Sequence, residues 1–534
     1  MKFIFNKNLV IILFFFPNFL FSQNEDKVDV YTKYKPLLSD ARRVESQPEI
    51  KHPEPQNLNL KYNFTDFRYK VNPNFTPVSA QGYKAKALIP ENSNFVKAGF
   101  GNYLTPLVHI NLHNSYNKNY SYGLNVFHLS SSGKTQNSFM NDDVQLFGSR
   151  ALNGNNLSGK IGFDRFSYYY YGYDHEKYNF KKDSINQVLS DIYTNIHFDN
   201  INTPKKVKTG FDIDFFRFAS KEQAELNYKI SNSTSFIIRN GEISIKSAYE
   251  GFTTDMDTGK FIRNYVDINP SYKLKYKEVY ITAGVFASLI FDSTESSPII
   301  YPQFNLDYYL VPEKTKAYIG LNGSLYKSSI KYLYNKNPYI TPYFEIRNIY
   351  SPYIIYGGIK GKIGNSFDYL IEISHQAVKN MPLFLSDSFE LRKFVLLYDD
   401  IGLFKFKTGI NLKKFEKIKL STDFTFFGYT TNETYAYQMP QFEWNTNIST
   451  MLNSKISLGA NVFVIGKRYA KTVGAWQSKE LSPIADININ AGYNLNKKLS
   501  IFINLNNLTN KDYQLWYNYP VYKINGIGGI TFKF

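Results

Sequence analysis

The chain has 534 residues, a formal net charge of +17 and no cysteine, which excludes a disulfide framework and any thiolate metal site. Aromatic residues make up 17% of the chain, with 45 Tyr and 45 Phe. This excess is unusual for a soluble enzyme and typical of a membrane barrel, which needs aromatic girdles at both interfaces.

The N-terminus carries the pattern of an export signal. Basic residues precede an apolar run at residues 9–16, and Ser22 before Gln23 offers a small residue at a suitable cleavage position. The run is shorter than the roughly 18 residues that a spanning helix needs, and Pro17 interrupts it. We therefore predict a signal peptide over residues 1–22.

Residues 23–94 form a second compositional region, with frequent proline, mixed charge and weak alternation. We predict a mostly irregular segment that lies in the periplasm or inserts into a barrel lumen. Residues 25–30 suggest an edge strand for pairing with another protein, but an ordinary polar N-terminus with two valines explains them better.

From Phe95 onward, segments alternate between apolar and polar residues and are separated by turn residues. In the segments 107–116 and 120–130, pairing of Tyr116 with Tyr120 places the apolar residues of both on one face. A slip of one residue would mix the two faces, so the register is well specified. We expect a lipid face and a lumen face. The lumen-facing candidates are His109, Asn111, His113 and Asn125.

The same pattern over residues 95–534 predicts an all-β transmembrane antiparallel barrel of about 22 strands. Their expected centres are Ala98, Leu112, Leu124, Leu146, Gly162, Tyr193, Ile213, Leu226, Ile243, Ile268, Ala283, Phe304, Leu321, Tyr356, Leu370, Phe406, Thr422, Thr446, Ala460, Ile489, Ile503 and Ile530.

The connections alternate in length, as expected for short periplasmic turns and long outer loops. The predicted short turns include 153–155, 231–233, 276–278, 364–366, 453–455 and 496–498. The predicted long loops include 172–187, 328–349, 379–400, 467–483 and 508–522. The apolar stretch 389–398 is assigned to a loop, because counting it as a strand would break this alternation.

The C-terminus reads as the final barrel strand. Ile530, Phe532 and Phe534 alternate with small or polar residues, and the chain ends on an aromatic residue. We predict that these three residues form the signal that the barrel-assembly machinery recognises.

Residues 504–513, Asn-Leu-Asn-Asn-Leu-Thr-Asn-Lys-Asp-Tyr, resemble the penultimate strand and loop of TonB-dependent receptors. The resemblance is closest over residues 500–534 and implies a 22-stranded barrel that transports a ligand across the outer membrane. Receptors of that family carry a globular plug domain longer than the segment available here. The resemblance therefore covers the barrel only, and we predict that the plug is missing.

The sequence contains no catalytic motif of the common hydrolases or nucleotide-binding enzymes, so we expect a protein that is not an enzyme. His109 and His113 lie four residues apart, about 13 Å along a strand, which is too far to chelate one metal ion. We predict no catalytic residue, no cofactor and no metal site.

Two features of the sequence leave alternatives open. The positive charge suits an anionic substrate in the lumen, but lysines at turns and rims that face water and lipopolysaccharide explain it better. The tyrosine-rich stretches 168–173 and 513–522 suggest stacking on a ligand at the outer mouth, but girdle aromatics explain them more simply.

We therefore predict transport of a solute or ligand across the outer membrane of a Gram-negative bacterium, through a polar lumen gated by the N-terminal segment and the long outer loops. The alternative is a non-transporting structural or interaction barrel within a secretion or surface-assembly complex. Expected partners are outer-membrane lipid, lipopolysaccharide and the barrel-assembly machinery. TonB or a periplasmic or surface protein is a further candidate partner, and nucleic acid is not expected.

Overall fold

The computed structural model describes residues 94–114, 120–133, 137–200, 206–257, 259–292, 298–414 and 417–534. The predicted signal peptide, its cleavage site at Ser22 and Gln23, and the N-terminal segment up to residue 93 lie outside the described residues.

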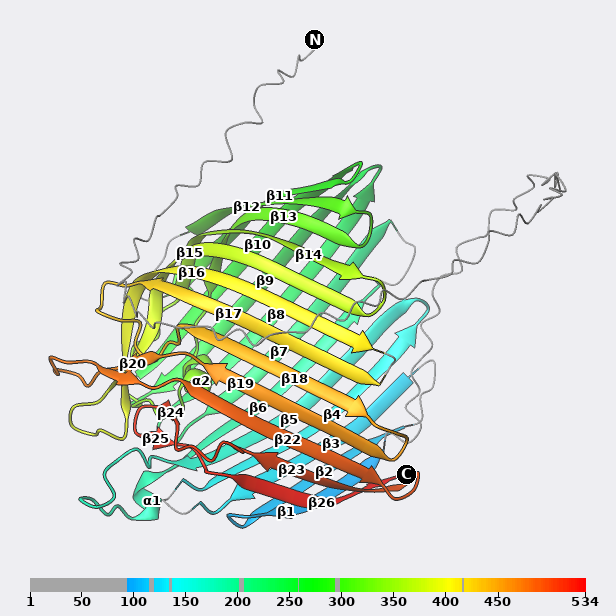
Figure 1. Cartoon of the computed structure of the whole chain (residues 1–534). Coiled ribbons are helices and arrows are strands. Elements are labelled where there is room, and N and C mark those ends of the chain that lie inside the picture. Colours follow the sequence, from blue (N-terminus) through cyan, green and yellow to red (C-terminus); the bar gives the residue numbers. More distant parts are fainter. Residues whose placement is uncertain are drawn as a thin grey trace, which may run out of the picture. The chain divides into compact units, whose positions relative to one another are not determined.

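Twenty-two strands form one closed antiparallel sheet, in which β1 pairs with both β2 and β26 (Figure 1). The strands are β1 Phe95–Gly101, β2 Thr105–His113, β3 Tyr120–Ser131, β4 Phe139–Leu152, β5 Asn155–Tyr169, β6 Asn186–Asp199, β7 Val207–Ala219, β8 Ala224–Ile238, β9 Gly241–Met256, β10 Gly259–Tyr276, β11 Val279–Asp292, β12 Pro298–Val311, β13 Thr315–Tyr326, β14 Ile349–Ile363, β15 Phe367–Ser386, β16 Phe394–Lys414, β17 Ile418–Thr430, β18 Phe442–Met451, β19 Ile456–Ile465, β22 Ile484–Asn494, β23 Leu499–Asn506 and β26 Asn525–Lys533. Every predicted strand centre falls in one of these strands, which confirms the barrel and its strand count.

Six short elements lie in the connections: α1 Lys182–Ile185, α2 Ile330–Lys336, β20 Arg468–Ala470, β21 Lys479–Leu481, β24 Gln514–Trp516 and β25 Tyr519–Pro520. Neither helix of the described chain is long and apolar enough to cross a membrane. In Figure 1, α1, β20, β24 and β25 gather at one end of the barrel, and the short turns and the C-terminus lie at the other. We call the first end the outer mouth and the second the periplasmic end.

The register of the first hairpin is the predicted one. Asn111 pairs with Asn125 and Leu112 with Leu124, the same offset as the expected pairing of Tyr116 with Tyr120, although Tyr116 itself lies outside the described residues. Along the strands, apolar side chains on alternate positions are exposed on the outer surface, which is the arrangement of a lipid-facing wall. Examples are Val144, Leu146, Ile161, Ile196, Ile230, Ile268 and Ile300.

Two predicted connections are wrong. The stretch 389–398 is not all loop, because β15 and β16 continue past the expected ends of the two strands. Their pairing extends from Val378 with Ile401 to Ser386 with Phe394. In this extension the side chains of both faces are buried, partly by Tyr437 of a neighbouring loop. The stretch adds no separate strand and instead leads into β16, so the alternation of short and long connections is unchanged.

The predicted turn at 231–233 lies inside β8, and the actual turn is at 239–240. Asn232 continues the strand and donates from Nδ2 to Thr209 Oγ1 at 3.3 Å. Thr209 and Thr234 share a hydroxyl hydrogen bond of 2.9 Å across β7 and β8. Polar side chains therefore pair between strands toward the periplasmic end, where the sequence pattern indicated a turn.

Candidate functional site

The connection between β13 and β14, residues 327–348, packs against the lumen side of the barrel wall, and we call it the inner loop. Its helix α2 contacts β7 and β8. Ile330 and Leu333 of α2 are fully buried, and Tyr334 packs against Phe218 of β7 with ring centroids 5.9 Å apart. The inner loop therefore occupies part of the outer mouth as a folded element whose core it shares with the wall and the other outer loops.

Local sequence explains why α2 starts where it does. Ser329 has extended backbone angles, and its side chain accepts a hydrogen bond of 3.0 Å from the backbone N–H of Tyr332. A serine in this geometry satisfies one of the free N–H groups of the first turn. The helix ends at Asn337, whose backbone N–H donates to the Leu333 carbonyl.

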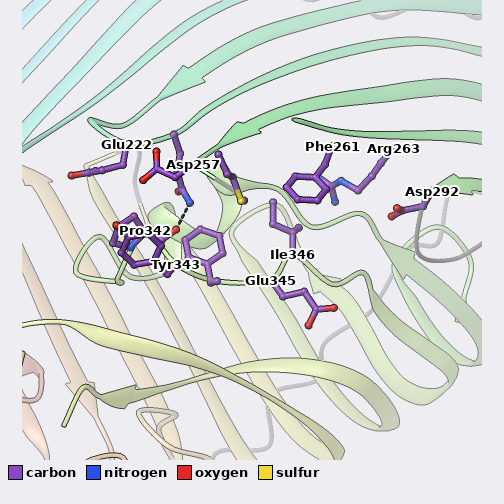
Figure 2. A pocket seen from close by; sticks show the side chains of 12 residues that line it. Glu222, Asp257, Phe261, Arg263, Asp292, Pro342, Tyr343, Glu345 and Ile346 are labelled. Carbon is purple, nitrogen blue, oxygen red and sulfur yellow. Dashed lines mark hydrogen bonds between the residues drawn. The ribbon is translucent and has the colours of Figure 1, made fainter. Parts of the chain in front are cut away.

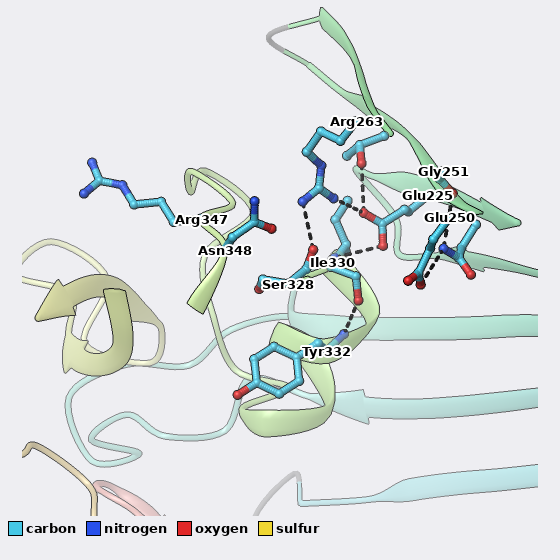
Figure 3. Close-up of polar contacts among 12 residues, drawn as sticks. Glu225, Glu250, Gly251, Arg263, Ser328, Ile330, Tyr332, Arg347 and Asn348 are labelled. Carbon is cyan, nitrogen blue, oxygen red and sulfur yellow. Dashed lines mark hydrogen bonds and ion pairs between the residues drawn. The ribbon is translucent and has the colours of Figure 1, made fainter. Parts of the chain in front are cut away.

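A buried ion pair on the wall holds the start of α2 (Figure 3). Glu225 Oε2 of β8 and Arg263 Nη2 of β10 lie 3.1 Å apart, with side chains 0% and 5% exposed. Glu225 Oε1 accepts from the backbone N–H of Ile330 at 3.0 Å, and Arg263 Nη1 donates to the Ser328 carbonyl at 2.8 Å. Both members of the ion pair therefore bind the inner loop as well as each other.

Two lysines of the inner loop complete the polar attachment to the wall. Lys327 Nζ lies 3.1 Å from Glu250 Oε2 of β9 and 2.6 Å from Asp267 Oδ2 of β10. Lys331 forms an ion pair with Asp191 of β6. Charges with so little solvent contact need their partners, because an unpaired buried charge is strongly unfavourable. We call the charged wall residues Asp191, Glu225, Glu250, Arg263 and Asp267 the wall anchors.

The tyrosine-rich stretches lie in a core made by the outer loops. Tyr168 and Tyr519 are each 2% exposed and belong to one buried cluster with residues of α2. Tyr170 donates from its hydroxyl to the Ile340 carbonyl at 3.0 Å. The expectation that girdle aromatics explain these stretches is wrong for the buried tyrosines, which pack loop against loop.

Beside the inner loop lies a cavity of about 430 Å³, which we call the mouth pocket (Figure 2). Its walls come from the β7–β8 turn, from the outer ends of β9, β10 and β11, and from residues 342–346 of the inner loop. The apolar lining residues are Met256, Phe261, Pro342, Tyr343, Phe344 and Ile346, and the polar ones are Glu222, Gln223, Asp257, Arg263, Asp292 and Glu345.

Three of the four lumen-facing candidates form one hydrogen-bonded group on β2 and β3. Asn125 Oδ1 lies 2.9 Å from His109 Nε2 and 3.4 Å from Asn111 Nδ2, and Asn125 Nδ2 donates to Asp143 Oδ1 at 3.1 Å. His113 lies apart from this group, with Nδ1 2.9 Å from the Asn114 carbonyl oxygen. The group belongs to strands other than those of the wall anchors.

The C-terminal residues Ile530, Phe532 and Phe534 are 54%, 45% and 48% exposed on the outer surface. The Phe532 and Phe534 rings stack with centroids 5.8 Å apart.

Within the described residues, no three His, Asp or Glu side chains come close enough together to hold a metal ion.

Sequence reasoning missed the wall anchors. Alternation alone would place Asp267 on the lumen face, because it lies between the exposed apolar residues Val266 and Ile268. The role of the wall anchors depends on the inner loop, whose contacts with Asp267 and Arg263 span 60 and 65 residues of the chain. No local pattern signals that contact.

No family model matches the sequence, and a search of curated proteins finds no relative. Solved structures with the same fold include the FrpB iron transporter of Neisseria meningitidis, with a TM-score of 0.64 and 9% identity over 83% of this chain and 82% of that one. The ferric-catecholate import receptor Fiu of Escherichia coli K12 matches with a TM-score of 0.62 and 10% identity over 83% and 82% of the two chains. The siderophore receptor PirA of Acinetobacter baumannii gives 0.61 and 10% over 83% and 80%. The protein is therefore a 22-stranded β-barrel of the Gram-negative outer-membrane type, with the fold of the TonB-dependent receptors.

Proposed function

We propose that this protein is a receptor-type transport barrel and not an enzyme, in which a ligand binds at the outer mouth and enters when the inner loop leaves the wall. The observation that carries the proposal is the polar attachment of the inner loop to the wall anchors. Lys327 and Lys331 form ion pairs with the wall, and the buried Glu225–Arg263 pair makes hydrogen bonds to the start of α2. The similar structures named as an iron transporter and an import receptor support transport as the activity.

The width of the barrel gives a physical reason for such a gate. A lumen enclosed by 22 strands is wide enough to need closure. The charged part of the attachment can be solvated by water when the loop detaches, whereas the apolar contacts of α2 with Leu189 and Phe218 favour the closed state. We propose the inner loop as the outer gate and residues 23–94 as a second gate, with His109, Asn111, His113 and Asn125 facing the polar path.

A cysteine crosslink tests the gate directly, because the natural chain contains no cysteine. In a variant with Asp191→Cys and Lys331→Cys, a short bifunctional thiol reagent will tie α2 to β6. In a background that also lacks residues 24–94, the proposed second gate, we expect the uncrosslinked variant to conduct in a planar bilayer, since it has lost one anchor, and the crosslinked form to close. Reduction of a cleavable reagent should restore the conductance.

The matched control is Ser121→Cys with Ser149→Cys, on neighbouring wall strands where the two hydroxyl oxygens are 2.7 Å apart. This crosslink should leave conductance unchanged. A gate at the inner loop is refuted if the crosslink between α2 and β6 has no more effect than the control crosslink. Comparing the full chain with a variant lacking residues 24–94 then tests the second gate in the same bilayer.

One observation favours the alternative of an interaction barrel. Phe389 and Trp476 are 96% and 101% exposed, on two loops joined through a bridge between Ser386 and Thr472. Large aromatic side chains exposed on neighbouring loops are typical of protein-binding surfaces. If the protein is an interaction barrel, changing both aromatics to serine should abolish co-purification of its surface partner. Loss of the partner together with zero conductance in every gate variant would favour the interaction role.

A further inference from the structure

The mouth pocket combines an aromatic lining with an acidic rim. Four carboxylate side chains line it, against one guanidinium, although the whole chain carries a formal charge of +17. In Figure 2, Glu222 and Asp257 lie on one side of the cavity, and Asp292 and Glu345 lie on the other, toward Arg263. The local charge is therefore opposite in sign to that of the protein.

The positive charge at the pocket is already matched. Arg263 pairs with Glu225 behind the pocket wall, and its guanidinium also lies 4.9 Å from the centre of the Phe252 ring. Arg347 pairs with Glu345 at 2.6 Å, which reduces the charge of that carboxylate. Within the described chain, Glu222 and Asp257 make no ion pair, so they dominate the potential that a ligand would meet.

A buried acceptor among the lining residues has no partner within the described part of the chain. Gln223 is 5% exposed, and its Nε2 donates to the Pro342 carbonyl, which fixes the orientation of the amide. The opposite atom, Oε1, is buried and makes no hydrogen bond with any residue that the structure describes. Buried acceptors are normally satisfied, so an orphaned one beside a cavity indicates a place for a donor from outside the chain.

We propose that the mouth pocket binds a small organic cation, a primary ammonium joined to an apolar body. The ammonium lies between Glu222 and Asp257 and donates to Gln223 Oε1 after a small shift of the pocket wall. The apolar body packs against Phe261, Phe344 and Ile346, with aromatic faces near the charge adding cation–π attraction. The inference rests on the proposed function and deepens it by naming a ligand class.

The chemistry of the pocket disfavours other classes. An anion of the same size would meet the carboxylates of Glu222 and Asp257, and the described lining residues offer no free cation to offset them. A neutral apolar molecule would displace water from those carboxylates and leave Gln223 Oε1 without a donor, which is unfavourable. A cation with N–H donors satisfies both requirements at once.

Binding is tested with two probes that share one ring system. Tryptamine carries a primary ammonium at neutral pH, and indole-3-acetate carries a carboxylate. Isothermal titration of the full chain in lipid nanodiscs should show tryptamine binding about ten-fold tighter than indole-3-acetate, and the difference should shrink at high salt. The N,N,N-trimethyl analogue keeps the charge but loses the N–H donors, and should bind more weakly than tryptamine. Equal affinity for the cation and the anion would overturn the proposal.

Variants locate the site. Glu222→Gln with Asp257→Asn should weaken tryptamine binding by about ten-fold. The control Asp183→Asn removes an exposed carboxylate from α1, outside the pocket, and should leave binding unchanged. Ile346→Ala should weaken all indole probes alike, because it removes apolar contact and no charge. Unchanged tryptamine affinity in the double variant contradicts the proposal.

These measurements are separate from the test of transport. If the cation fails to bind while the crosslink on the inner loop still closes the lumen, the ligand class is wrong and the gate stands. If the cation binds while every gate variant stays closed, the pocket is real and the transport function is wrong.

Discussion

Tyr339 of the inner loop and Tyr519 of β25 stack face to face, with ring centroids 3.6 Å apart and planes at 21°. Tyr519 also contacts Tyr171 edge-on at 4.8 Å and Phe394 at 6.0 Å. Three outer loops and the extended β15–β16 hairpin therefore meet at one ring. This aromatic core therefore joins the outer loops to one another, while the wall anchors hold the inner loop to the barrel wall.

The first prediction concerns that ring. Tyr519→Ala removes a side chain that is 2% exposed and should destabilise the loop core by about 3–5 kcal/mol, the usual cost of deleting a buried aromatic ring. Conductance in a planar bilayer should rise. Tyr178→Ala, at an exposed position of the α1 loop, is the control and should behave like the natural protein. Closed channels in both variants would show that the core does not restrict the mouth.

The second prediction concerns the buried ion pair. Glu225→Gln leaves Arg263 without its carboxylate, and breaking a buried pair on one side costs about 3–5 kcal/mol. Because Glu225 also accepts from the Ile330 N–H, the loss should appear first in the inner loop. Amide hydrogen exchange over residues 328–337 should become faster, while exchange in the β8–β9 ladder stays slow. Replacing Glu225 and Arg263 together by leucine should recover part of the protection, since no lone charge remains. Equal protection in Glu225→Gln and the natural chain would contradict this.

The barrel was predictable from sequence, whereas the contacts of the inner loop with the barrel wall were not. Alternation is local, so strand centres and the register at Leu112 and Leu124 follow from short segments. The buried tyrosines were misassigned because a ring in a girdle and a ring in a loop core look alike in a sequence. The pairing of Lys327 with Asp267 needs the folded inner loop, and no short segment contains that information.

The third prediction is an opening of the mouth at high pH. Desolvation raises the pKa of Tyr332 and Tyr339 in the inner loop to about 12. A phenol whose pKa is higher in the folded state than in the unfolded state stabilises the folded state. This contribution is fully present below the unfolded pKa near 10 and is lost as the pH rises through about 12. Conductance should therefore increase between pH 10 and 12. Tyr332→Phe with Tyr339→Phe removes both phenols and should reduce the increase. An identical pH profile in this variant would mean that other groups control the opening.

The fourth prediction concerns the link between two outer loops. Arg468 of β20 donates through Nη1 and Nη2 to the Leu515 and Gln514 carbonyls of β24, and burial lowers its pKa to about 10. Arg468→Met should release the β24–β25 loop, because two carbonyls lose their charged donor. Limited proteolysis should cut that loop faster. Lys467→Met, which removes an exposed charge paired with Glu480, is the neighbouring control. Equal cleavage rates in both variants would assign no restraining role to Arg468.

The last prediction separates recognition from stability at the C-terminus. The Phe534 backbone N–H donates to the Asn94 carbonyl at 3.1 Å, but its side chain is 48% exposed and packs mainly on Phe532. Phe534→Ser should therefore cost the folded barrel little. If the residue is part of the assembly signal, the same change should sharply lower the amount of barrel in the outer membrane. Heat-modifiable mobility on gels measures the amount of folded barrel. Denaturation of the folded variant purified from the membrane measures its stability. Phe100→Ser, at an exposed apolar position on neighbouring β1, is the control. An equal loss of folded barrel in both variants would mean that lipid contact, and not recognition of the final residue, is the cause.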